Sequence, residues 1–341
     1  MANKGKYYES QFEEATIELL HESHWQYTFG DDIHRKYTDP LIEEDLRSFL
    51  IKQYEEKNLT ATEIDGIVAN LRNTGGQNDY HALRHTFLLY RDGYDFAYSD
   101  CRDNPFRLEY IDFEHPNHNI FRCVNQFVME QGRENRRPDI LLFINGIPVC
   151  IIELKNPTKQ NATIRDAHTQ ICTRYMRDIP ALLKYCALAV ISDGAKNALG
   201  TTYTPFEFFY EWKKIENKAG KGLDTLRTLI RGALSPERIL EILRDYVYFP
   251  DPTKEDDTTE IVCRYPQFFA TRKLRDHILN HLRSVGGDGK GGTYFGATGC
   301  GKTYTMLFLA RQLALRCRKQ LGSPTILIIV DREDLETQTG K

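Results

Sequence analysis

The pattern of apolar and polar positions along the chain predicts a mixture of helices and strands. Apolar residues recur at helical spacing in long segments, and a capping box of Thr60 and Glu63 marks the start of another helix. Short continuous apolar runs are typical of strands buried on both faces, and aromatic residues among turn signals favour strands over residues 84–130. The predicted helices cover residues 9–21, 40–50, 60–71, 164–178 and 223–246, and the predicted buried strands cover residues 140–144, 148–152 and 185–191.

Charged residues at the ends of one predicted hairpin are the first candidate site. Asn145-Gly146 separates two β-rich runs, Asp139 precedes the first run, and Glu153 and Lys155 end the second. If the loop between the strands has an odd number of residues, such as three with Gly146 in the left-handed conformation, Asp139 lies directly opposite Glu153. Lys155 then projects from the same face of the hairpin, two residues further on. Two carboxylates and an ammonium suit a divalent metal and a water that attacks a phosphodiester. The alternative is a surface ion pair of little energetic value.

A glycine-rich segment near the other end is the second candidate site. It fits the phosphate-loop pattern of Gly, four residues and Gly-Lys-Thr, and a strand over residues 293–295, a helix over 303–319 and a parallel strand over 325–330 are predicted around it. Backbone amides would bind phosphate oxygens, Lys302 would reach the terminal phosphates, and Thr303 would hold magnesium. The alternative is a structural turn. The candidate nucleotide-binding residues are Gly296, Gly299, Gly301, Lys302 and Thr303.

Composition changes this picture in two ways. A length of 341 residues with 41% hydrophobic residues predicts at least two domains, and residues 249–259 have the composition of a linker. We therefore expect one domain over residues 1–250 and another over 251–341. The net charge of −3 argues against a broadly cationic nucleic-acid binder, but residues 133–184 hold nine basic and five acidic residues, a local charge of +4. This excess favours a phosphate-backbone substrate near Asp139, with a mixed solvated face as the alternative.

The cysteines and the longest apolar runs bear on the compartment. The eight cysteines show no CxxC or Cys/His spacing for zinc, and no run approaches the length of a membrane span. The first residues lack the apolar core of a secretory signal. We expect a cytoplasmic protein with reduced cysteines and no membrane partner.

Several short motifs, taken in order, resemble a known family. Segments from residue 125 to residue 157 resemble the nuclease core of the R subunit of type I restriction endonucleases. Ser192-Asp193-Gly194 with Gly200-Thr201 resembles a turn of the same domain. Arg264-Tyr265-Pro266-Gln267 resembles the glutamine motif of superfamily 2 helicases, and Asp331-Arg332 resembles a later segment of those motors. The nuclease-like segments are Asn125-Gln126-Phe127-Val128, Arg136-Arg137-Pro138-Asp139, Asn145-Gly146-Ile147-Pro148 and Ile152-Glu153-Leu154-Lys155-Asn156-Pro157.

The resemblance implies roles for particular residues. Asp139 and Glu153 would ligate Mg²⁺, with Lys155 assisting the nucleophilic water. Gln170 and Tyr175 match a glutamine and a tyrosine that the family uses after the hairpin. Arg174 lies one helical turn from Gln170, so it would share that face and support DNA binding, unless this is an ordinary polar helix surface. Glu13 resembles an acidic residue on the first helix of some members, with an exposed glutamate as the alternative, and Gln267 would contact the adenine of ATP.

The implied fold is α/β: a restriction-endonuclease-like mixed sheet flanked by helices, followed by the beginning of a RecA-like parallel-sheet phosphate-loop domain. The implied function is magnesium-dependent cleavage of double-stranded DNA, with ATP-driven translocation, in a complex with methyltransferase and specificity subunits. We expect the motor to be incomplete in these 341 residues and not to hydrolyse ATP alone. The alternatives are a DNA-end repair nuclease-helicase, for which cleavage would not need a methylation-sensitive complex, and a catalytically silent fragment that docks on the methyltransferase.

Overall fold

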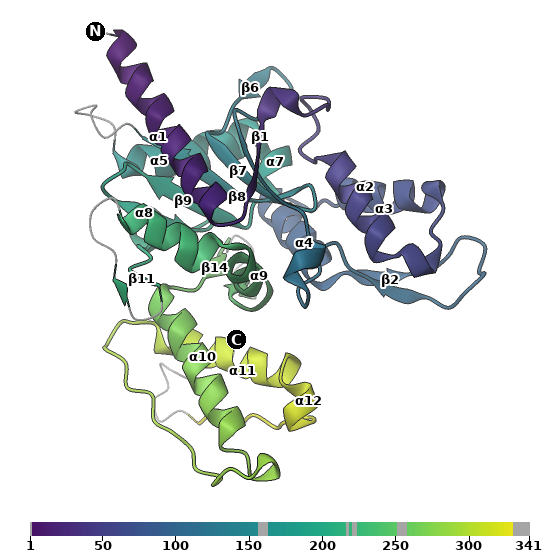
Figure 1. Cartoon of the computed structure of the whole chain (residues 1–341), viewed down its shortest axis with the longest axis vertical. Helices are drawn as coiled ribbons and strands as arrows, with labels where there is room; N and C mark the ends of the chain where they lie inside the picture. Colours follow the sequence, from purple (N-terminus) through teal and green to yellow (C-terminus); the bar gives the residue numbers. More distant parts are fainter. Residues whose placement is uncertain (1, 156–162, 216–217, 220–223, 251–257, 330–341) are drawn as a thin grey trace. The chain divides into compact units, whose positions relative to one another are not determined.

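A computed structural model describes residues 2–155, 163–215, 218–219, 224–250 and 258–329 of the chain (Figure 1). The chain forms two compact units, Met1–Arg244 with Thr258–Glu260 and Asp245–Asp257 with Ile261–Lys341. The predicted linker falls largely on residues 251–257, which lie outside the described residues. The boundary at residue 250 therefore stays a prediction.

A mixed six-stranded sheet forms the centre of the first unit. Its strand order is β1-β4-β7-β8-β9-β10, in which β1 pairs with β4 and β8 pairs with β9 in parallel, while the other neighbours are antiparallel. The central strands are buried along their whole length, as their continuous apolar runs predict. The strands are β1 (Gln26–Phe29), β4 (Phe121–Asn125), β7 (Ile140–Ile144), β8 (Ile147–Leu154), β9 (Leu188–Ser192) and β10 (Asn197–Gly200).

The hairpin of β7 and β8 has the expected register at its open end, but its turn is shorter than expected and one strand contains a β-bulge. Ile140 pairs with Ile152, so the next residues outward, Asp139 and Glu153, lie opposite each other. The loop has two residues with positive φ, Asn145 and Gly146, rather than three. The pairing then shifts between Leu142 and Phe143, where the opposite strand carries one extra residue. The predicted three-residue loop is wrong, because this β-bulge supplies the odd residue inside the strand instead.

Helices cover the sheet and surround it. The helical segment that follows β8 consists of α5, a π-helix over Gln170–Tyr175, and α6. It packs on one face of the sheet through Ala167, Ile171 and Tyr175, which form a core with strand residues such as Leu141 and Ile151. Helix α1 lies against β1 and β8, as can be followed in Figure 1. The helices of this unit are α1 (Ala2–Glu22), α2 (Glu43–Gln53), α3 (Ala61–Asn73), α4 (Asp79–Asp92), α5 (Ile164–Thr169), α6 (Met176–Asp178), α7 (Pro180–Leu183), α8 (Asp224–Leu229) and α9 (Pro236–Asp245, whose last residue belongs to the second unit).

Local sequence signals had mixed success in placing these helices. The capping box of Thr60 and Glu63 is present at the start of α3, as predicted. Helix α2 begins at Glu43 and not at residue 40, because the Asp39 carboxylate accepts a hydrogen bond from Leu41 N in a preceding turn. The strands expected over residues 84–130 were partly wrong: α4 occupies the first part, since Asn78 caps it and its buried residues recur at helical spacing. Short pairs follow, β2 (Tyr94–Phe96) with β3 (Phe106–Leu108), β5 (Met129–Gln131) with β6 (Glu134–Arg136), and β11 (Lys214–Ile215) with β12 (Lys218–Ala219).

The hairpin turn gives a test of stability. Gly146 has φ +76°, and a Cβ there would lie 2.1 Å from the carbonyl oxygen of Ile42. We expect Gly146→Ala to lower the free energy of unfolding by about 2 kcal/mol or more, because both the backbone conformation and the contact oppose a side chain. Gly66→Ala is the control, since Gly66 lies in α3 with nothing within 4 Å of its Cβ position and should gain about 0.5–1 kcal/mol. Urea denaturation of both variants measures the difference, and equal midpoints would contradict it.

The second unit is largely helical in its described part. Helices α10 (Tyr265–Asn280) and α11 (Lys302–Leu315) pack together, α12 (Arg318–Leu321) follows, and a two-stranded pair joins β13 (Val247–Tyr248) to β14 (Ile261–Val262). The ring of Tyr246 contacts Phe268 and Phe308 at centroid distances of 4.9 and 5.3 Å.

The parallel sheet predicted for this unit is absent from the described residues. Residues 293–295 and 325–329 form no strand, and Phe295 and Leu327 are 95% and 80% exposed. An apolar run becomes a strand only when a neighbour takes up its backbone hydrogen bonds, and no described residue does so here. In the helix that does form here, α11, Thr305, Phe308 and Gln312 are buried, whereas the apolar Met306 and Leu315 are exposed.

Candidate active site

The open end of the β7–β8 hairpin brings three predicted site residues together. Glu153 is buried to 1% exposure at the end of β8, and its Oε1 accepts a hydrogen bond of 2.7 Å from Lys155 Nζ. Asp139 lies opposite, and its Oδ2 accepts a hydrogen bond of 2.7 Å from the backbone amide of Leu154. The backbone of Lys155 is held by Ser192 at the end of β9, through a bond of 2.7 Å from its N–H to the Ser192 oxygen. Three strands of the central sheet thus fix the cluster.

The helical run after the hairpin adds two more of the predicted residues. Gln170 Oε1 accepts a 2.8 Å bond from Lys155 Nζ, and Gln170 Nε2 donates a 2.7 Å bond to the Tyr175 hydroxyl. That hydroxyl in turn donates to Glu153 Oε2 over 3.3 Å. The five side chains Asp139, Glu153, Lys155, Gln170 and Tyr175 therefore share one end of the sheet.

A π-helix brings Gln170 and Tyr175 together. Residues Gln170–Tyr175 have π geometry, in which backbone pairs are five residues apart, so Tyr175 and not Arg174 becomes the partner of Gln170. Arg174 is exposed on this run and is not hydrogen-bonded to Gln170 in the structure. The shared face of Gln170 and Arg174, and a role of Arg174 in DNA binding, therefore stay predictions.

Burial and like charge dominate the electrostatics of Glu153. Burial, with the neighbouring charge of Asp139, raises the pKa of Glu153 to about 8, although the ammonium of Lys155 opposes the shift. Burial and the charge of Glu153 also raise the pKa of Tyr175, so its hydroxyl remains a hydrogen-bond donor. A buried carboxylate that faces a second carboxylate is stabilised when a cation is bound between them.

This raised pKa predicts a pH-dependent stability of the metal-free protein. A carboxyl whose folded-state pKa exceeds its unfolded value favours folding below the unfolded pKa, and that contribution is lost as the pH rises through the folded pKa. Relative to Glu153→Gln, the wild type should lose up to about 1.4 kcal/mol per pH unit between about pH 4.5 and 8. Thermal unfolding in EDTA across this range measures the difference, and Mg²⁺ should reduce it. Parallel pH profiles for the two proteins would contradict the electrostatic account.

A second polar cluster borders the first. The carboxylate of Glu13 on α1 accepts hydrogen bonds from Asn125 Nδ2 at 2.6 Å and from Gln126 Nε2 at 2.9 and 3.0 Å. Gln126 has a positive φ of 55°, and its backbone N–H lies 3.4 Å from the Asp139 carbonyl oxygen. Glu13 is therefore joined to the strand end beside Asp139 rather than standing free in solvent.

The glycine-rich segment forms a loop before α11. Gly299 and Gly301 have φ of +77° and +79°, and Gly301 caps the helix that begins at Lys302. Lys302 Nζ donates to the carbonyl oxygens of Gly296 and Ala297 at 3.0 and 3.2 Å, so its side chain folds back over the loop. Thr303 lies in the first turn of the helix. The glycine-rich loop therefore ends at the N-terminus of α11, with Lys302 and Thr303 in its first turn.

Gln267 lies against this loop within the second unit. Its Nε2 donates to the Gly301 oxygen at 3.2 Å, and its Oε1 accepts from the backbone N–H of Arg264. A Cβ on Gly301 would lie 2.2 Å from Gln267 Nε2. The structure therefore places Gln267 next to the loop, whereas Asp331 and the motif around it lie outside the described residues.

Two known protein families match the regions that contain these two sites. The family model described as type I restriction enzyme R protein N terminus matches residues 6–208, which is more than half of the chain and includes the whole hairpin cluster. The chain belongs to this family. A second model, described as SWI2/SNF2 ATPase, matches residues 266–341, which include the glycine-rich loop.

Individual relatives agree with the family assignment. The chain is similar to the type I restriction enzyme HindI endonuclease subunit of Haemophilus influenzae, with 29% identity over 97% of this chain and 32% of the relative. It is also similar to the type I restriction enzyme EcoprrI endonuclease subunit of Escherichia coli, with 28% identity over 56% of this chain and 59% of that protein. A counterpart from Methanocaldococcus jannaschii shares 29% identity over 96% of this chain and 33% of its own length. The chain thus spans about a third of the length of the first and third relatives.

Several of the charges counted over residues 133–184 of this R-protein segment are paired with one another. Arg136 and Arg177 both pair with the buried Asp178, and Arg136 also contacts Glu134, so these charges compensate each other. Arg137, two residues before Asp139, and Arg174, on the π-helix, are exposed.

No helix in the described part of the chain combines the length and the hydrophobicity that crossing a membrane requires.

Proposed function

We propose that this chain carries the DNA-cleaving site of a type I restriction complex, with Asp139, Glu153 and Lys155 as its catalytic residues. The observation that carries the proposal is the register of β7 and β8. It sets Asp139 opposite Glu153 and leaves Lys155 hydrogen-bonded to Glu153 over 2.7 Å at a buried strand end. A buried carboxylate held this way is costly to the fold and is expected at a functional site.

The residues present fit a divalent cation held by oxygen atoms. Glu153 is buried beside the charge of Asp139, and burial with this charge raises its pKa, so a bound cation would offset the repulsion. The Asp139 and Glu153 carboxylates would hold Mg²⁺, and the backbone carbonyl of Leu154 is a further oxygen at the same strand end. Bound Mg²⁺ supplies Lewis-acid stabilisation of the phosphate and lowers the pKa of a water molecule.

The protein's own side chains would orient the reaction. Lys155 Nζ is held between Glu153 Oε1 and Gln170 Oε1, so its ammonium is fixed beside the carboxylates and can position the attacking water and the phosphate oxygen. Tyr175 donates to the other oxygen of Glu153 and thereby fixes the rotamer of that carboxylate. Gln170 joins the two, because it contacts both Lys155 and Tyr175. Gln170 and Tyr175 are therefore positioning residues in this proposal.

Double-stranded DNA is the proposed substrate. Exposed Arg137 and Arg174 would contact its phosphates, since Arg137 lies two residues before Asp139 and Arg174 lies on the π-helix that carries Gln170 and Tyr175. Double-stranded DNA would reach this site as part of a complex with methyltransferase and specificity subunits. The names of the relatives support this setting, since each named relative is an endonuclease subunit of a type I restriction enzyme.

The second unit would bind ATP and contribute to a DNA-translocating motor. The similarity of residues 266–341 to SWI2/SNF2 ATPases supports this, together with the loop of Gly296, Gly299 and Gly301 at the start of α11. Lys302 would exchange its carbonyl contacts for the terminal phosphates, Thr303 would hold the magnesium of the nucleotide, and Gln267 would contact the adenine.

The proposal is tested on a type I complex whose endonuclease subunit carries this sequence. Cleavage of circular plasmid DNA should require Mg²⁺ and ATP and should be blocked by methylation of the recognition site. Cleavage of free DNA ends without the partner subunits, insensitive to methylation, would instead identify a repair nuclease. An assembled complex that translocates DNA but never cuts it would contradict the nuclease assignment.

A further inference from the structure

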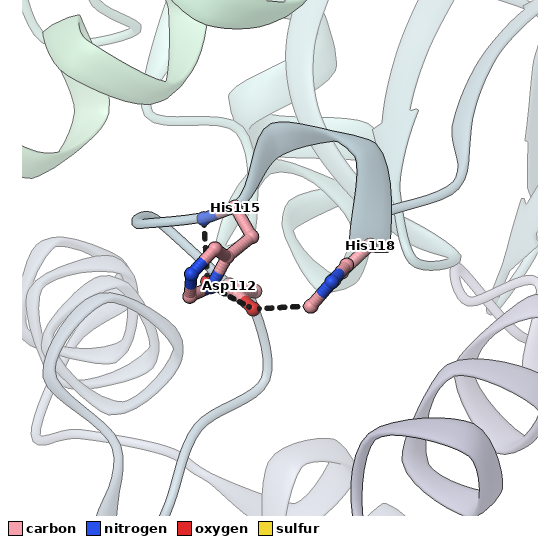
Figure 2. Close-up of side chains that lie close together, drawn as sticks. All are labelled: Asp112, His115 and His118. Atoms are coloured by element: carbon pink, nitrogen blue, oxygen red, sulfur yellow. Dashed lines mark hydrogen bonds and ion pairs between the residues drawn. The ribbon is translucent and has the colours of Figure 1, made fainter.

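A cluster of metal-binding side chains lies apart from the proposed nuclease site. Asp112, His115 and His118 each offer one ligand atom, and these atoms all lie within 4.8 Å of one another. Figure 2 shows dashed lines that join the Asp112 carboxylate to both histidine residues. The three residues follow an Asp-x-x-His-x-x-His spacing on a single loop.

The distances within the cluster suit a shared ion. Asp112 Oδ2 lies 3.2 Å from His115 Nδ1 and 2.9 Å from His118 Nδ1, and the two rings stack at 4.8 Å with 24° between their planes. Ligands at 2.0–2.1 Å from a tetrahedral metal ion are about 3.3 Å apart. The two oxygen–nitrogen distances are therefore close to the ligand separations of a metal site, and all three ligand atoms lie within 4.8 Å of one another.

The loop that carries the cluster is held in place without any ion. Asp112 Oδ1 accepts hydrogen bonds from the backbone amides of Glu114 and His115, at 3.0 and 2.9 Å. Asn119 closes the loop, because its Oδ1 accepts from Asp112 N and its Nδ2 donates to Asp112 O. Asn145 of the β7–β8 turn donates to the same Asn119 oxygen over 2.8 Å. The ligand set is thus preorganised on the rigid hairpin turn, which favours binding.

The charge and exposure of the cluster also fit an ion. The buried Asp112 carboxylate would supply negative charge to a cation, and its Oδ2 also accepts a hydrogen bond of 3.2 Å from Gln53 Nε2. The side chains of His115 and His118 are 67% and 50% exposed, so water can reach a fourth position.

The acidic neighbour Glu114 is engaged elsewhere. Its Oε1 accepts a hydrogen bond of 2.9 Å from Arg244 Nη1. The ligand set is therefore one carboxylate and two imidazoles, and this mixture favours first-row transition ions over Mg²⁺ or Ca²⁺, which prefer oxygen donors throughout.

We propose that Asp112, His115 and His118 form a binding site for a divalent transition-metal ion such as Zn²⁺, with water at the open position. The site lies at the turn end of the β7–β8 hairpin, whereas Asp139 and Glu153 lie at its open end. The five residues of β7 separate them by about 17 Å at roughly 3.4 Å per residue. The ion would cross-link three residues within the 112–119 loop. It is distinct from the magnesium of the nuclease site.

The test is Zn²⁺ binding to the 341-residue chain by equilibrium dialysis at pH 7.5, with millimolar Mg²⁺ present to occupy oxygen-only sites. The wild type should bind one Zn²⁺, and His115→Ala/His118→Ala should weaken binding by about a hundredfold or more. Asp112→Asn should also weaken it while keeping an oxygen that accepts the loop amides. His21→Ala/His34→Ala is the matched control, because both histidines are exposed and outside the cluster, and its binding should equal that of the wild type.

Thermal unfolding supplies a second readout. Zn²⁺ should raise the melting temperature of the wild type and of the control, but not that of His115→Ala/His118→Ala. The proposal is overturned if the wild type binds no Zn²⁺, or if the cluster variants and the wild type bind it equally.

Discussion

Glu153→Ala is expected to reduce magnesium-dependent DNA cleavage by at least about a thousandfold in a type I complex whose endonuclease subunit carries this sequence. The substitution removes one of two facing carboxylates and also the partner of Lys155 and Tyr175, so the proposed metal and water would both lose their positions. The fold should survive, because the change relieves the burial of a carboxylate whose pKa is raised by that burial. Asp139→Ala and Lys155→Ala should have losses of similar size.

The chain contains a matched control for this experiment. Glu211 and Lys213 have the same two-residue spacing as Glu153 and Lys155, but they are exposed and separated by 3.6 Å. Glu211→Ala and Lys213→Ala should therefore cleave DNA at the wild-type rate, since a solvated pair contributes little. Translocation should continue in all of these variants, and it distinguishes a lost nuclease from a failed assembly. Wild-type cleavage by a folded Glu153→Ala complex would rule out the site.

Lys302→Ala is expected to reduce ATP hydrolysis by the same complex by about a hundredfold or more, and with it translocation. Lys302 is the one cation of the glycine-rich loop, and its ammonium already rests on the carbonyl oxygens of Gly296 and Ala297, where the terminal phosphates would replace them. Lys319→Ala in α12 is the control for loss of a positive charge, because that residue is exposed. Phosphate release and ATP affinity, measured on the same samples, report the two effects.

Metal binding at the nuclease site of the Lys302→Ala variant tests whether the two units act independently. Lys302→Ala should leave Mg²⁺ or Mn²⁺ binding at Asp139 and Glu153 unchanged, because those residues belong to the other unit. ATP hydrolysis that persists at the wild-type rate in Lys302→Ala would show that this loop is not the nucleotide site.

The hairpin shows how far sequence reasoning reaches. The Asn145-Gly146 pair and the flanking apolar runs are local signals, so both strands and the pairing of Asp139 with Glu153 were predictable. The bulge was not, because an extra residue in one strand depends on packing against the rest of the sheet and leaves no mark in a binary apolar pattern. Asp139 still lies opposite Glu153, but through a two-residue turn and a β-bulge instead of a three-residue loop.

Two other features depended on interactions that sequence spacing does not reveal. The α-helical rule links residues three or four positions apart, whereas in the π-helix Gln170 donates a hydrogen bond to Tyr175, five positions on, whose hydroxyl bonds to Glu153. The strands expected over residues 293–295 and 325–330 failed for the opposite reason, since a strand needs partners and no described residue pairs with 293–295 or 325–329. The Asp112 cluster had a signal in its spacing, but only the folded loop shows that both histidines face one carboxylate oxygen.

Mn²⁺ binding to the 341-residue chain, followed by electron paramagnetic resonance, tests the central claim most directly because it needs neither DNA nor partner subunits. The comparison is between His115→Ala/His118→Ala and the same protein with Asp139→Asn and Glu153→Gln added, so that the histidine cluster cannot contribute. We predict that the first protein binds one Mn²⁺ that millimolar Mg²⁺ displaces, and that the second does not bind it. Equal Mn²⁺ binding by both folded proteins would contradict the assignment of Asp139 and Glu153 as the metal ligands.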